Sequence, residues 1–143
     1  MSRSVLGTAL LVLLWLVVFA APARAHEVRP AYLELRQTSA DAWDLRFRVP
    51  ARGRLRLALD PRLPEHCART SAPRARFVDN AYVEEWSIRA PGGIEGHEIR
   101  VEGLAATMID VLVRIERLDG GMQVVRLLPS SPSFVVERTP SGL

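Results

Sequence analysis

The sequence predicts an all-β fold, an immunoglobulin-like antiparallel β-sandwich of seven to eight short strands that follows an N-terminal signal helix. Two observations support this prediction. Apolar and polar residues alternate with a period of two through much of the chain, as in strands that bury one face. Ten prolines and nine glycines separate these segments with frequent turns. After the first 25 residues no segment has the period of a helix.

The first 25 residues have the pattern of a signal peptide. A short basic start precedes an almost unbroken apolar run over residues 5–21. Pro22 ends this run, and Ala23 and Ala25 are the two small residues that signal peptidase reads. The alternative is an uncleaved membrane anchor, since the run approaches the roughly 20 residues of a span. The alanine pair favours cleavage and a periplasmic protein.

The expected β-sandwich domain covers residues 26–137, and its first strands alternate clearly. In residues 32–36, Leu33 and Leu35 share one face. Two further strands are expected at residues 43–49 and 55–59. Residues 60–75 contain three prolines and no period, which predicts a long irregular crossover.

The second half of the domain alternates in the same way. Asp119 and Gly120 predict a tight type I′ hairpin turn, because this turn requires positive φ at both central residues. Residues 138–143 are expected to be a disordered tail. The remaining expected strands are residues 82–89, 97–101, 108–118, 122–128 and 133–136.

Composition excludes several functions. All 19 basic residues are arginine, so lysine Schiff-base chemistry is excluded. Without Arg3 and Arg24 of the leader, 17 arginines face 16 acids, a balance that gives no reason to expect nucleic-acid binding. No nucleophile-elbow, zinc-protease or phosphate-loop motif occurs, and the sequence therefore predicts a protein that is not an enzyme.

Histidines are the candidate metal ligands. Cleavage after Ala25 makes His26 the first residue, so that its α-amine and Nδ1 can chelate one ion. His66 and His97 are the other two histidines. Nitrogen ligands of this kind favour Cu(II) or Ni(II). The alternative is that the histidines have no ligand role.

The single cysteine, Cys67, cannot form an internal disulfide. It is a buried apolar residue, an intermolecular partner or a metal ligand, and the first of these is favoured.

Several arginines are expected on the outward faces of two adjacent strands. They can meet anionic lipid headgroups, where each basic residue contributes about 1 kcal/mol. The favoured alternative is a solvated face on which they pair with glutamates of neighbouring strands. The candidates for membrane contact are Arg46, Arg48, Arg54 and Arg56, with Arg52 between them.

A set of short segments, at residues 26–35, 92–96, 103–104, 107–115, 119–120 and 129–136, resembles a known family. In their order they resemble the extracytoplasmic N-terminal region of HupE/UreJ-type hydrogenase/urease accessory membrane proteins, over nearly all of the expected domain. The resemblance implies a β-rich domain outside the membrane, followed by membrane helices linked to uptake of nickel or another metal.

The chain departs from this family in two respects. It ends at Leu143, close to where the resemblance implies that membrane helices follow. Transport would then need that portion or a separately encoded partner. The resemblance also implies that some relatives have a cysteine at Ala90, able to pair with the one matching Cys67, so a disulfide is expected to have been lost here.

Three functions follow as hypotheses. The first is a non-enzymatic extracytoplasmic domain of a HupE/UreJ-like metal uptake or accessory system, which binds metal or docks on a membrane permease. The second is a free periplasmic copper-binding protein, similar in plan to CopC-like sandwiches, that uses His26. The third is a structural sandwich left by a truncated gene.

Overall fold

The computed structural model of the protein describes Gly7 and residues 29–139. These residues form eleven strands and a short 3-10 helix, so the all-β prediction is confirmed, with more strands than expected. The elements are β1 (Ala31–Gln37), β2 (Ala42–Arg52), β3 (Leu55–Arg56), β4 (Asp60–Arg62), β5 (Ala68–Arg69), β6 (Arg74–Val78), β7 (Ala81–Arg89), β8 (Glu98–Glu102), η1 (Leu104–Ala106), β9 (Val111–Glu116), β10 (Met122–Leu127) and β11 (Ser133–Val135).

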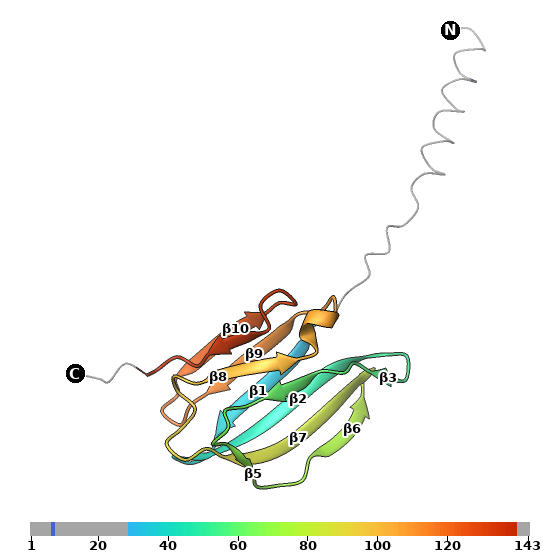
Figure 1. Ribbon diagram of the computed structural model, residues 1–143. Helices are drawn as coiled ribbons and strands as arrows, with labels where there is room; N and C mark the ends of the chain where they lie inside the picture. The colour runs from blue at the N-terminus through green and yellow to red at the C-terminus, as the bar shows by residue number, and fades with distance from the viewer. Residues whose placement is uncertain (1–6, 8–28, 140–143) are drawn as a thin grey trace.

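The strands form two sheets that enclose one core. The eight-stranded sheet has the order β10-β9-β1-β2-β7-β5, with β3 paired to β2 and β6 paired to β7. The three-stranded sheet has β8 between β11 and β4. In Figure 1, β8 crosses the large sheet, and one hydrophobic cluster joins residues of both sheets. The predicted sandwich is therefore confirmed.

Alternation explains which residues form the core. Leu33 and Leu35 of β1 are buried against Phe47 of β2, while the side chains between them face solvent. Ile99 and Val101 of β8 supply the facing layer. Each strand of this kind buries every second residue, because successive side chains point to opposite faces of a sheet.

One ladder departs from the antiparallel expectation. β1 pairs with β9 in parallel, from Ala31 opposite Val111 to Arg36 opposite Glu116. Parallel neighbours need a long connection, which here consists of the strands and loops between β1 and β9. A period of two shows which face a strand buries but not which strand lies beside it, so this pairing could not be predicted.

The predicted strand at residues 55–59 is wrong beyond Arg56. Leu55 is 74% exposed whereas Leu59 is buried, so the two leucines do not share a face. The Arg56 guanidinium donates to the carbonyl oxygens of Leu57 and Leu59, at 3.0 and 3.2 Å. These bonds accompany the turn of the chain away from β2 toward the small sheet. The crossover expected to be irregular contains β4, β5 and the start of β6.

The predicted hairpin between β9 and β10 is confirmed, but its turn type is wrong. Gly120 has a φ of 85°, its N–H donates to the carbonyl of Arg117 at 3.0 Å, and Asp119 does not share the positive φ. β9 is also shorter than the strand predicted at residues 108–118. Two consecutive residues with positive φ occur instead at Asp79–Asn80, in the turn between β6 and β7.

Candidate functional site

Two predicted metal ligands, His66 and His97, lie beside each other. His66 belongs to the connection between β4 and β5, and His97 directly precedes β8. Their ring centres are 4.5 Å apart and their planes are inclined by 48°. His66 is half-buried and His97 is exposed. The fold thus joins two residues that are distant in the sequence, and we call them the histidine pair.

A backbone carbonyl orients His66. Its Nε2 lies 2.7 Å from the carbonyl oxygen of Gly93. Because a carbonyl oxygen only accepts hydrogen bonds, Nε2 donates, and the neutral ring keeps its lone pair on Nδ1. Metal-binding histidines commonly donate their other ring N–H to such a carbonyl, which fixes the tautomer.

The loop that presents Gly93 and His97 is held in place from several sides. Gly92, Gly93 and Gly96 have φ values of 79°, 83° and 76°, which glycine adopts without steric cost. Ile94 is fully buried and anchors the loop in the core. The position of His97 is therefore set by packing and by backbone conformation together.

The chain after β11 is attached to the same loop. The N–H of Val136 donates to the carbonyl of His97 at 2.9 Å. Arg117, whose side chain is only 8% exposed, donates to the carbonyl of Glu137 at 2.7 Å and forms an ion pair with Glu95 at 3.2 Å. The histidine pair therefore borders the point where the described chain leaves the sandwich.

Cys67 follows His66, but its side chain packs against the hydrophobic core. Burial raises the pKa of the Cys67 thiol, which disfavours the thiolate that binds metal. Of its three predicted roles, the packed apolar residue fits these observations. Within residues 29–139, no group of three or more His, Cys, Asp or Glu side chains is placed to hold a metal ion. Among the described residues, the site thus brings two imidazoles together.

The 4.5 Å separation of the ring centres falls in the range of two imidazoles on one ion and also in that of two rings packed without an ion. With metal–nitrogen bonds of about 2.0–2.1 Å, two imidazoles held near a right angle on one ion have ring centres roughly 4.5–5 Å apart. The observed separation is 4.5 Å. Imidazole is a suitable ligand for zinc, copper and nickel. Such an ion would keep open coordination positions for water or for a further ligand.

The arginines predicted to contact a membrane do not form one continuous stripe. Arg46 and Arg56 form ion pairs with glutamates of β7, at 3.5 and 3.1 Å. Arg48 and Arg54 have no ion pair with any residue that the structure describes. The first two agree with the alternative of pairing across strands, and the second two remain available to a partner.

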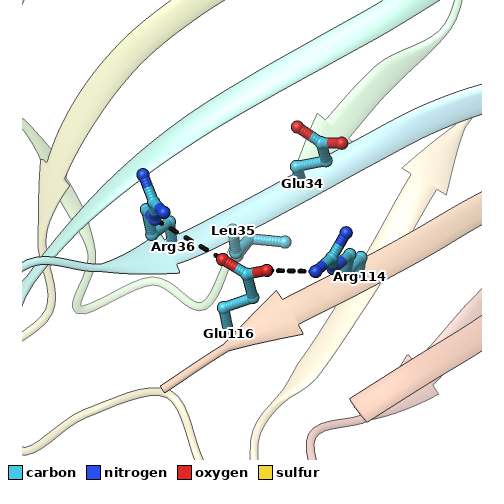
Figure 2. A pocket seen from close by; sticks show the side chains of 5 residues that line it. All are labelled: Glu34, Leu35, Arg36, Arg114 and Glu116. Atoms are coloured by element: carbon cyan, nitrogen blue, oxygen red, sulfur yellow. Dashed lines mark ion pairs between the residues drawn. The ribbon is translucent and has the colours of Figure 1, made fainter. Parts of the chain in front are cut away.

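The outer face of the large sheet has a hollow of about 250 Å³ lined by charged side chains. Figure 2 shows Glu116 between Arg36 and Arg114, with an ion pair to each and Glu34 nearby. Exposed pairs of this kind contribute about 0–1 kcal/mol. Opposite charges neutralise one another here, so the hollow does not favour a ligand of one sign.

Comparison with known proteins does not assign this chain to a family. No family model and no curated protein matches it. The resemblance to HupE/UreJ-type proteins therefore stays a prediction that depends on the sequence segments named above.

The predicted leader and amino-terminal chelate cannot be compared with the fold. Ala23, Ala25 and His26 lie outside the described residues, so cleavage and chelation at this terminus stay predictions. Among the described residues, no helix is both long enough and apolar enough to cross a membrane.

Two features of the molecule were not predicted. The Gly93 carbonyl that orients His66 has no signal in the sequence, because its direction depends on the loop backbone. The sequence pattern also places Leu55 and Met108 within strands, whereas both side chains are exposed. Gly53, two residues before Leu55, is the one local signal that indicates a hairpin tip rather than a continuous strand.

Proposed function

We propose that the chain is a non-enzymatic extracytoplasmic domain of a HupE/UreJ-like metal uptake or accessory system, and that it binds a transition-metal ion through His66 and His97. The observation that carries this proposal is the 4.5 Å separation of the two rings, together with the hydrogen bond from His66 to Gly93. The family resemblance supplies nickel as the first ion to test.

A packing contact between two neutral imidazoles is the competing explanation of the pair. Two features favour a ligand role. His97 is exposed, so the contact buries little apolar surface, and the carbonyl of Gly93 leaves the lone pair of His66 on Nδ1. An ion bound between the two rings would be coordinated by Nδ1 of His66 and by a ring nitrogen of His97.

Metal titration of untagged protein, exported and processed by a bacterial host, tests the site. We expect one Ni(II), Cu(II) or Zn(II) ion per chain by calorimetry. His66→Ala and His97→Ala should each weaken binding by tenfold or more, the scale seen when a metal site loses an oriented group. Cys67→Ala is the matched control and should leave affinity unchanged. Equal affinity in both histidine variants and the unaltered protein contradicts the proposal.

A second variant separates this site from an amino-terminal chelate. One residue added ahead of His26 moves the α-amine away from its imidazole and destroys that chelate. We expect the extended protein to keep its affinity. If extension removes binding while His66→Ala has no effect, a CopC-like copper site at His26 replaces the histidine pair as the explanation.

Docking on a membrane partner requires a separate measurement. The protein should recover a polytopic membrane protein when it is purified from its own cells after mild crosslinking. Recovery of water-soluble proteins alone contradicts the docking part of the proposal, whereas the metal titration is unaffected by that result.

A further inference from the structure

Three projecting segments lie at the end of the sandwich opposite the histidine pair: the β2–β3 hairpin, the β6–β7 turn and the segment before β9. The N–H of Ala51 donates to the carbonyl of Asn80 at 3.0 Å, and that of Ala31 donates to the carbonyl of Asp110 at 2.9 Å. β5, which follows His66, pairs instead with the last residues of β7. Figure 1 shows β3 and β6 together at this end. We call these three segments the arginine end.

Each projecting segment exposes a large apolar side chain. Leu55 of the β2–β3 hairpin is 74% exposed, Phe77 beside the β6–β7 turn is 54% exposed and Met108 before β9 is 88% exposed. Scattered apolar residues on a surface need no explanation, but three large ones on projecting segments at one end are a reason to propose an interaction site there.

The charges at this end are mainly positive. Arg48, Arg52 and Arg54 form no ion pair with residues 29–139. Asp110 is already bound by Arg126, whose Nε lies 2.7 Å from its carboxylate. Asp79 is the remaining acid of the turn. Guanidinium groups bind phosphate through two parallel hydrogen bonds, and they stay charged at every physiological pH.

Two of the projecting segments, the β2–β3 hairpin and the β6–β7 turn, are tied to β7 by side-chain contacts. The Tyr82 hydroxyl donates to the carbonyl of Arg54 at 2.5 Å, which ties the hairpin tip to β7. The rings of Phe77 and Tyr82 are in edge contact, with centres 5.1 Å apart. Since these groups are already ordered, binding through them loses little conformational entropy.

We propose that the arginine end docks on an anionic lipid bilayer, with Leu55, Phe77 and Met108 among the headgroups and the arginines on lipid phosphates. Apolar tips surrounded by basic residues are the pattern of proteins that bind at the membrane surface. A second copy of the chain is a poorer partner, because it would bring like-charged arginines together. This inference does not depend on metal binding.

Vesicle sedimentation tests the proposal with the exported, processed protein. We expect binding to vesicles of phosphatidylcholine with phosphatidylglycerol, little binding to phosphatidylcholine alone, and loss of binding as salt rises from about 0.1 M to about 1 M. Arg52→Gln with Arg54→Gln should weaken binding about 25-fold, since each basic residue near the surface contributes about fivefold. Leu55→Ser with Met108→Ser should also weaken it.

The matched control is Arg36→Gln with Arg114→Gln, which removes the same charge from the outer sheet face. It should bind the anionic vesicles as the unaltered protein does. Equal loss in both double variants, or absence of binding by the unaltered protein, overturns the proposal. Dimerisation without lipid that Leu55→Ser abolishes also overturns it, in favour of a contact between copies. Thermal unfolding of every variant confirms that each one is folded.

Discussion

The arginine end and the loop around the histidine pair, here called the histidine end, differ in how they hold their exposed groups. At the arginine end, hairpin turns project Leu55 and Phe77 outward, and hydrogen bonds between hairpins keep them there. At the histidine end, a glycine-rich loop lies between the crossover that carries His66 and the chain after β11. The exposed apolar residues at the arginine end therefore lie on hairpins that are bonded to each other. The polar loop at the histidine end is bonded on one side to His66 and on the other side to the chain after β11.

The two ends of β8, which Gly96 precedes and Gly103 follows, should respond differently to the same substitution. Gly103 and Gly96 both have positive φ, but a Cβ on Gly103 would lie 2.1 Å from the backbone oxygen of Ala58. A Cβ on Gly96 would meet only the flexible side chain of Arg138. We expect Gly103→Ala to lower the free energy of unfolding by about 4 kcal/mol and Gly96→Ala by about 1–2 kcal/mol.

Urea unfolding measures both values. Gly92→Ala is the control for backbone strain alone, because no atom lies within 4 Å of its added Cβ. Gly92→Ala should lower the free energy of unfolding by about as much as Gly96→Ala does. If all three variants lose equal stability, the clash of the added Cβ with the backbone of Ala58 has no effect, and the expected difference between the two ends of β8 disappears.

A new disulfide should stiffen the histidine end selectively. Ala68 pairs with Arg89, so the register continued by one residue places Cys67 opposite Ala90. We expect Ala90→Cys to form a disulfide with Cys67 and to stabilise the protein by about 3 kcal/mol. Thiol counting and unfolding with and without reductant measure this effect. Ala106→Cys, at the other end, should leave two free thiols, and persistence of both thiols in Ala90→Cys contradicts the continued register.

The smallest expected effect is on the pH dependence of stability. Burial raises the pKa of the Cys67 thiol in the folded protein. The unfolded thiol therefore ionises first, so stability is complete below its usual pKa of about 8.5 and falls as pH rises through the folded value. In Cys67→Ala, the free energy of unfolding should fall less with rising alkaline pH, because the contribution of the thiol is missing. Parallel unfolding curves of the two proteins across alkaline pH would show that the thiol is not buried.

The fold class could be predicted because half-buried strands leave a local signal. Leu33, Leu35 and Phe47 alternate with charged residues, and each pattern corresponds to a strand of the structure. β6 left no such signal, since all its residues are exposed. The alternation of leucines over residues 55–59 predicted that Leu55 is buried. In the structure β3 ends at Arg56, and Leu55 is exposed on the hairpin.

The candidate site could be predicted only in part. Residue type alone identified His66 and His97 as possible ligands, because imidazole is a common metal ligand. Their contact depends on the loop from β7 to β8 and on the crossover before β5, two segments without periodicity. The hydrogen bond to Gly93 is a property of backbone direction, which sequence patterns do not encode.

The parallel ladder between β1 and β9 has a consequence for how the chain folds. β1 lies inside the large sheet, yet its partner at Val111 is made about 80 residues after Ala31, and contacts of such sequence separation slow folding. Until residues 111–116 fold, the edge of β1 that pairs with β9 has no partner, and an unpaired strand edge favours mispairing. The large sheet therefore reaches its final topology only when β9 pairs with β1.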